Sequence, residues 1–323
     1  MRQIILQMGL LSFLFSCNGQ NDQLTTVDQL TEKDAPKLPP AYTSIKKALK
    51  EPEKVLYLDL SSQKLSKVPN GLVQFKNLQY LNLRNNKFSE LPAEIAQLDK
   101  LIQLDIAYNE NLRSLPTEFD KITKLQVLDM SGTSIGSIPK FVFKCQAFEE
   151  LIANGAHLTE LPKEIGDLKN LERIWLGFNK IKTIPQEIGA LKKLWWFHAN
   201  HNEFEFLPKE FGQLSSLTDL ELSYNKLTGL PTEFGNLKKL ETLDLYGNYI
   251  KTLTPEFGNL ENLSWVQLID NELTTLPYEI KNLKKLTYII AQRNKIPETE
   301  QKRLQGLMPH VTIDFAAQFQ TMK

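Results

Sequence analysis

One repeated motif constrains the fold of this 323-residue chain more than any other feature of its sequence. Residues 78–92 define the template, which reads L-x-x-L-x-L-x-x-N-x-L-x-x-L-P. Eleven units start at Val55, Leu78, Leu101, Leu125, Phe148, Leu171, Leu194, Leu217, Leu240, Leu263 and Leu286. They lie 23 residues apart, except for 24 between Leu101 and Leu125. Such a period predicts a single solenoid, with no residues left for a second domain.

Each unit has two parts with different expected structures. The x-L-x-L part alternates, which predicts a short strand with its leucines inward, and a return of about 17 residues allows parallel stacking. The ninth position is Asn in eight of the eleven units, which predicts a hydrogen-bonded ladder. Gln63, Thr133 and Ala156 are the exceptions, so units four and five should be its loosest part. The Pro-x-Glu that follows predicts a short helical turn with Glu near its start.

The second half of each unit reads P-x-E-[IF]-G-x-L, as in residues 162–168. Together the two halves resemble the 23-residue form of the leucine-rich repeat family, including its Ras-associated, plant intracellular and bacterial proteins. The resemblance covers residues 55–297. It implies an α/β fold: a horseshoe-shaped solenoid with a parallel β-sheet on its concave side and short helical or irregular convex segments. It also implies partner binding, without indicating which partner.

Both ends of a solenoid need caps, because its core and strand edges would otherwise be exposed. We expect residues 43–54 to form the first cap, with a short helix capped by Thr43-Ser44. Residues 298–323 should form the second cap, a helix through Leu304 and Leu307 followed by a closing strand. The repeat domain is therefore predicted to extend over residues 43–323.

The N-terminus has the pattern of an export signal. Arg2 precedes an apolar stretch from Ile4 to Phe15, which at about 12 residues is too short to span a bilayer. Residues 14–17, Leu-Phe-Ser-Cys, resemble the lipobox of bacterial lipoproteins. That resemblance implies lipidation of Cys17 and a membrane-anchored protein of the cell envelope, periplasmic or surface-exposed. A plain signal and an uncleaved anchor are the alternatives. Residues 18–42 are polar and then proline-containing, which predicts a flexible tether.

Composition excludes several functions. Lys+Arg and Asp+Glu both number 38, and this balance argues against a nucleic-acid binder. No nucleophile elbow or phosphate-binding loop is present, and Cys145 takes the place of a core leucine. The two Cys and four His are not spaced as metal ligands, although His198 and His201 are three residues apart. We therefore expect no enzyme, no cofactor and no metal.

The concave strand positions of units six to ten carry the candidate binding site. Leucines already fill the core, so large side chains at these positions should face solvent and mark an interface. Three of the four tryptophans lie there. The predicted partner-binding residues are Arg173, Trp175, Phe178, Trp196, His198, His201, Asp219, Glu221, Tyr224, Asp244, Tyr246, Trp265 and Asp270.

Charged residues are segregated although the net charge is zero. Eight acids occupy concave positions against three arginines, while lysines precede the strands and predict a basic rim. The pattern favours a protein or peptide partner with a basic, partly apolar surface. The chain is expected to be monomeric and to meet the membrane through its lipid. A glycan-binding surface protein and a structural envelope spacer without a specific ligand are the alternatives.

Overall fold

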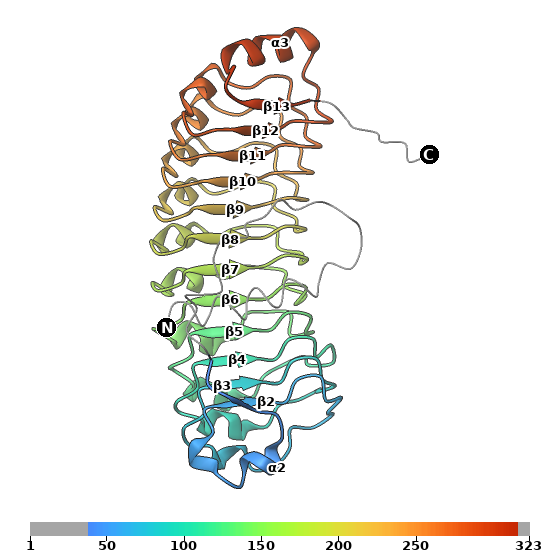
Figure 1. The fold of residues 1–323 in the computed structure, drawn as a ribbon, viewed down its shortest axis with the longest axis vertical. Helices are drawn as coiled ribbons and strands as arrows, with labels where there is room; N and C mark the ends of the chain where they lie inside the picture. Colours follow the sequence, from blue (N-terminus) through green and yellow to red (C-terminus); the bar gives the residue numbers. More distant parts are fainter. Residues whose placement is uncertain (1–37, 316–323) are drawn as a thin grey trace, which may run out of the picture.

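The computed structural model describes residues 38–315, and within them thirteen parallel strands form one sheet in sequence order (Figure 1). The strands are β1 Ala41–Tyr42, β2 Tyr57–Asp59, β3 Tyr80–Asn82, β4 Gln103–Asp105, β5 Val127–Asp129, β6 Glu150–Ile152, β7 Arg173–Trp175, β8 Trp196–His198, β9 Asp219–Glu221, β10 Thr242–Asp244, β11 Trp265–Gln267, β12 Tyr288–Ile290 and β13 Thr312–Asp314. Strands β2 to β12 are the predicted strands of the eleven units, so the predicted parallel solenoid is confirmed.

The register pairs each residue with the same position of the next unit. Tyr57 lies opposite Tyr80 and Leu58 opposite Leu81, and the same pairing continues through the sheet. The middle residue of every strand from β2 to β12 is buried. A one-residue slip would turn these side chains to the other face, so the stacked apolar positions fix the register.

Short 3₁₀ helices form the return of units one to ten, on the other side of the core, and a further one precedes the first unit. They are η1 Pro52–Lys54, η2 Leu72–Gln74, η3 Ala93–Gln97, η4 Thr117–Lys121, η5 Lys140–Lys144, η6 Lys163–Asp167, η7 Gln186–Ala190, η8 Lys209–Gln213, η9 Thr232–Asn236, η10 Pro255–Asn259 and η11 Tyr278–Asn282. The predicted helical turns are confirmed, and from η3 to η11 all but η5 carry a glutamate in their first turn.

The glycine of the P-x-E-[IF]-G-x-L motif lets neighbouring 3₁₀ helices approach closely. A Cβ atom on Gly166 would lie 2.7 Å from the carbonyl oxygen of Glu187, and one on Gly189 would lie 2.6 Å from that of Glu210. Contacts this short are not possible for a real side chain. The sequence shows that glycine recurs at this position of the repeat. It does not show the close contact, because that contact forms between neighbouring units.

The asparagine ladder forms as predicted. Asn179 is typical: its Nδ2 donates to Ala153 O at 2.8 Å and to Leu176 O at 2.9 Å, and its Oδ1 accepts from Leu158 N at 2.9 Å. The other seven are Asn86, Asn109, Asn202, Asn225, Asn248, Asn271 and Asn294. Thr133 instead donates its hydroxyl to Met130 O within its own unit, at 2.8 Å, and Ala156 has no polar side chain. The ladder is therefore interrupted at units four and five.

Helices α2 Ile45–Ala48 and α3 Glu298–Leu307 lie at opposite ends of the solenoid (Figure 1). The side chain of Ser44 makes no capping hydrogen bond, so the predicted N-cap was wrong; the Ser44 carbonyl instead accepts from Lys47 N and Ala48 N. Ala41–Tyr42, assigned to the tether from sequence, pairs as β1 with β2, because the first strand edge offers unpaired backbone groups. The signal, Cys17 and most of the predicted tether lie outside the described residues.

Candidate binding surface

The parallel register sorts eight of the thirteen predicted binding residues into two rows on the sheet face away from the core, here called the open face, and Thr242 and Gln267 complete the rows. The third-position row is Arg173, Trp196, Asp219, Thr242 and Trp265, on β7 to β11. The fifth-position row is Trp175, His198, Glu221, Asp244 and Gln267 on the same strands. Residues scattered over nearly a hundred positions of sequence are thereby brought together on five neighbouring strands.

Three side chains on β7 and β8 form what we call the tryptophan cluster: Trp175, Trp196 and His198. The Trp196 and His198 rings stack with centroids 4.1 Å apart and planes 21° apart. The ring of Trp175 lies 5.2 Å from that of Trp196 and 5.0 Å from that of His198. The indole nitrogen of Trp196 is buried and has no hydrogen-bond partner within residues 38–315. The cluster therefore combines a broad apolar surface with an unused donor.

A second group of rings, the aromatic stack, consists of Phe178, His201 and Tyr224. Phe178 and His201 stack at 4.4 Å and 13°, and His201 and Tyr224 at 4.3 Å and 14°. Phe178 is 61% exposed and Tyr224 41% exposed, so the stack is not part of the core. Burial lowers the pKa of His201, which favours the neutral ring within the stack. The stack follows the strand ends of units six, seven and eight.

The backbone at the aromatic stack is in the left-handed region. Phe178, His201 and Tyr224 have φ of 57°, 51° and 52°. A non-glycine residue there costs about 1–2 kcal/mol. Other units place glycine at the same position, as at Gly155 and Gly247, with φ of 60° and 67°. The remaining units carry other non-glycine residues there, among them Ser62, Asn85 and Tyr108, so the left-handed backbone is a feature of the repeat and does not single out the rings. The sequence places these residues on the face but does not reveal this conformation.

Three carboxylates on β9 and β10, here called the β9–β10 carboxylates, are Asp219, Glu221 and Asp244. Thr218 and Thr242 hydroxyls donate to Asp219 at 2.6 and 2.7 Å. Gln267 Nε2 donates to Asp244 Oδ2 at 3.0 Å. Burial raises the pKa of Asp244 to about 6.

Glu221 lies beside a histidine. Its Oε2 is 2.9 Å from His198 Nδ1, which is close enough for a hydrogen bond when that nitrogen carries a proton. Burial alone would raise the pKa of Glu221, but contacts with His198 and the Ser223 hydroxyl outweigh it and hold the pKa below its usual value. Glu221 is therefore held as a carboxylate.

Arg173 is not an exposed binding residue, contrary to the sequence-based expectation. It is 5% exposed and pairs with Glu150, itself 1% exposed, on the neighbouring strand. A buried guanidinium requires such a partner, and the acid lies 23 residues earlier at the same repeat position. Asp270 is likewise paired, with Arg293 at 2.7 Å, and Arg293 also donates to the Tyr246 hydroxyl at 2.9 Å. Trp265 lies in the third-position row but makes no ring contact within residues 38–315.

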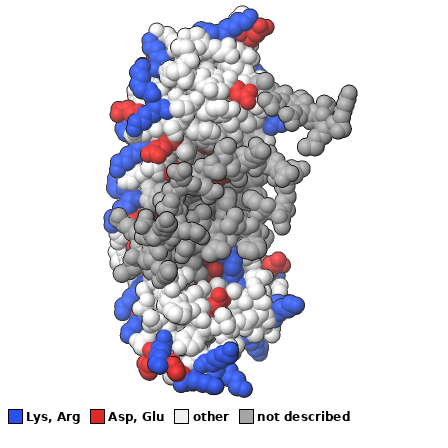
Figure 2. Space-filling model, viewed as in Figure 1, with Lys and Arg blue, Asp and Glu red and all other residues white. Residues whose placement is uncertain are grey.

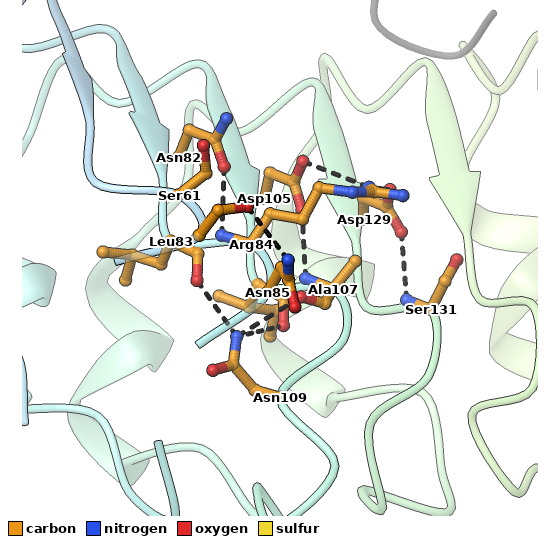
Figure 3. Close-up of polar contacts among 12 residues, drawn as sticks. Ser61, Asn82, Leu83, Arg84, Asn85, Asp105, Ala107, Asn109, Asp129 and Ser131 are labelled. Carbon is orange, nitrogen blue, oxygen red and sulfur yellow. Dashed lines mark hydrogen bonds and ion pairs between the residues drawn. The ribbon is translucent and has the colours of Figure 1, made fainter. Parts of the chain in front are cut away.

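Acids on the first half of the open face have a structural role that the sequence analysis missed. Asp105 Oδ1 accepts from Ala107 N at 3.0 Å, and Asp129 Oδ1 accepts from Ser131 N at 2.9 Å. Arg84 then bridges the two carboxylates, at 3.3 and 2.7 Å (Figure 3). These acids hold the turns after their strands and are neutralised within the chain. The predicted acidic concave face is therefore partly neutralised by the chain's own arginines.

Lys and Arg side chains gather along one long edge of the molecule (Figure 2). Several rim lysines are held by an asparagine of the preceding unit: Lys100 Nζ donates to Asn77 Oδ1, and Lys193 Nζ to Asn170 Oδ1, both at 2.6 Å. These hydrogen bonds hold the lysines in place along this edge.

Cys145 is fully buried, as predicted for a core thiol, and burial raises its pKa to about 11. Within residues 38–315 no group of three His, Cys, Asp or Glu side chains could hold a metal ion. None of the helices in this same range has the length and apolar character needed to cross a bilayer.

Comparisons with known proteins agree with the fold. Residues 47–151 match a leucine-rich repeat region, and residues 200–250 match a leucine-rich repeat. A search of curated proteins found no match. Among solved structures, a leucine-rich repeat protein of Leptospira interrogans is 29% identical, covering 86% of this chain and 100% of that chain, with a TM-score of 0.48.

Two further structures superpose more closely. An internalin from Listeria monocytogenes is 19% identical over 83% of this chain and 82% of its own, with a TM-score of 0.65. The ectodomain of the Arabidopsis thaliana receptor kinase GASSHO1/SCHENGEN3, in complex with CASPARIAN STRIP INTEGRITY FACTOR 2, is 23% identical with a TM-score of 0.61. That match covers 80% of this chain and 34% of the receptor chain. The chain therefore has the solenoid fold of these leucine-rich repeat structures, and two of its segments match leucine-rich repeat models.

Proposed function

We propose that this protein is a non-enzymatic binding module of the bacterial cell envelope that holds a protein or peptide on the open face of its sheet. The observation that carries the proposal is the placement of the tryptophan cluster and the aromatic stack on neighbouring strands of that face. Aromatic side chains dominate binding hot spots because they bury a large area and keep a polar group available.

Two properties of the rings support a role in binding over a role in packing. The core is complete without them, since the middle residues of β7, β8 and β9 are buried beneath the sheet. The outer rings of the aromatic stack are also exposed, with Phe178 at 61% and Tyr224 at 41%, so they add little to the core. An interface gains from both features, because rigid rings lose little entropy when a partner arrives.

The binding role can be tested with the full chain immobilised and exposed to a detergent extract of envelope membranes. A specific partner should be retained by the wild type and lost from Trp196→Ala and Tyr224→Ala. Glu261→Gln changes an exposed acid beside Lys238 and should retain the partner. Equal retention by all four proteins would contradict binding through the open face. Titration calorimetry with simple oligosaccharides would show whether the ligand is instead a glycan.

Envelope anchoring through Cys17 forms the second part of the proposal, and it rests on the sequence pattern of residues 1–17. Cys17→Ser should abolish labelling by a radioactive fatty acid and release the protein into soluble fractions. Unchanged labelling would overturn this part and leave the binding role intact. We also propose that the protein acts as a monomer, which sedimentation of the released form would test.

A further inference from the structure

Only some carboxylates of the open face are paired with an arginine of the chain. On the first half of the face, Arg84 bridges Asp105 and Asp129, and Arg173 pairs with Glu150. The β9–β10 carboxylates have no such partner: within residues 38–315 their contacts are to hydroxyls, an amide, a backbone N–H and His198. Arg293, two units beyond β10, is already engaged by Asp270 and Tyr246.

Aromatic side chains flank these carboxylates within the third-position row. The register places Trp196, Asp219, Thr242 and Trp265 side by side on β8, β9, β10 and β11. Neighbouring strands are about 4.8 Å apart, so the two tryptophans are roughly 14 Å apart with the acids between them. The fifth-position row adds His198 on the β8 side and Gln267 on the β11 side. A tryptophan thus lies on each side of the two strands that carry the acids, and aromatic rings attract cations.

The aromatic stack lies beyond the same strand. Tyr224 follows Glu221 by three residues, roughly 10 Å along an extended chain. An extended segment can therefore place one side chain on the carboxylates and an apolar neighbour on the stack. Adjacent same-side positions of an extended peptide are about 7 Å apart, and side-chain length covers the remaining distance of about 3 Å.

We propose that the open face receives an extended peptide segment whose arginine side chain is held by the β9–β10 carboxylates. The inference rests on the proposed binding role and specifies the chemistry of its ligand. A guanidinium fits better than an ammonium, because its planar fork can bond two carboxylate oxygens and stack on Trp196 or His198. The charge complementarity is direct: arginines of the chain neutralise Asp105, Asp129, Glu150 and Asp270, whereas these three, like Asp59 on β2, have no arginine partner within residues 38–315.

The probe is a displayed library of random linear peptides, selected on the immobilised full chain. Peptides that bind are synthesised in two forms, one with arginine and one with citrulline, which keeps the shape and lacks the charge. We expect selection to enrich arginine next to an aromatic or aliphatic residue. The citrulline form should bind at least about tenfold more weakly, because removing one partner of a close charge pair costs 2 kcal/mol or more.

Protein variants supply the reciprocal test. Glu221→Gln and Asp244→Asn preserve side-chain shape, and each should weaken the arginine peptide about tenfold without affecting the citrulline peptide. Glu261→Gln should leave both affinities unchanged, and melting curves confirm that every variant is folded. Peptides without arginine, or with lysine equally effective, would overturn the inference while leaving the binding role standing. A library from which no peptide is retained would contradict the proposed peptide-binding role itself.

Discussion

Arg173 and Glu150 form a two-point ion pair between β7 and β6, with Nε donating to Oε1 at 2.8 Å and Nη2 to Oε2 at 2.9 Å. Breaking a buried pair leaves one uncompensated charge and costs about 3–5 kcal/mol. Arg173→Met should therefore lower the free energy of unfolding by about that amount in urea titrations. The double variant with Glu150→Gln should recover most of it. A double variant as unstable as the single one would refute this account.

Gly212 packs against the next unit so closely that an added methyl group would overlap the carbonyl of Glu233. Gly212→Ala should cost about 1–3 kcal/mol, the usual penalty of overpacking. Gly229 provides the matched control, since a Cβ there meets no atom within 4 Å. Thermal melts that show the same loss for both variants would mean that the 3₁₀ helices are not closely packed.

Comparing Trp196 with Leu222 distinguishes a residue of the open face from a residue of the core. Leu222 is fully buried, and Leu222→Ala should cost about 2–5 kcal/mol of stability. Trp196 is only partly buried, and its replacement by Ala should cost about 1 kcal/mol, the value of its ring contacts. Urea unfolding of the two variants tests the geometry before any partner is known. Equal losses would place Trp196 in the core.

The left-handed backbone of Phe178 predicts an unusual order of stability. Phe178→Gly and Phe178→Ala remove the same ring contacts, but only glycine relieves the strain at φ 57°. The glycine variant should therefore be more stable than the alanine variant by about 1 kcal/mol. Alanine equal to or better than glycine in denaturant titrations would show that the conformation is not strained.

Asp244 should make stability fall as pH rises. Its pKa is about 6 in the folded protein, whereas an aspartate in an unfolded chain titrates near about 3.9. The folded state therefore holds the proton more tightly, and free energy of unfolding is lost as pH rises from about 4 to about 6. Asp244→Asn should remove this contribution. The difference between variant and wild type should then grow in favour of the variant up to about pH 6 and stay constant above it. A difference independent of pH would contradict the prediction.

The repeat made most of the fold predictable. Strand positions, parallel stacking, the asparagine ladder and its interruption all follow from which residue recurs at which position. The open-face location of the aromatic residues was predictable for the same reason, because alternation in a strand assigns each residue to one side. The cap at Ser44 failed because a preference for capping residues does not ensure that the hydroxyl is used.

Side-chain contacts between units could not be predicted from the sequence. Arg173 reads as an exposed recognition residue until Glu150 is seen beside it, and Asp105 reads as surface charge until its bonds to Ala107 N and Arg84 are known. Glu150 and Arg84 each lie about one repeat before the residue they pair with, and both ion pairs depend on side-chain conformation. The left-handed backbone at Phe178 was hidden as well, since only some units mark that position with glycine.

The interrupted ladder has a mechanical consequence. Units one to three and units five to eleven are each cross-braced by asparagine side chains, whereas within residues 38–315 no asparagine of the ladder joins unit three to unit four or unit four to unit five. There the units are joined by backbone pairing, core contacts, the Arg84–Asp129 ion pair and the bond from Asn154 N to the Ser131 hydroxyl. A solenoid held at its N-terminal end and loaded on β7 to β10 should flex at this joint first. All residues of the tryptophan cluster, the aromatic stack and the β9–β10 carboxylates lie on the longer arm. Bending at the joint would therefore absorb strain and leave their mutual spacing unchanged.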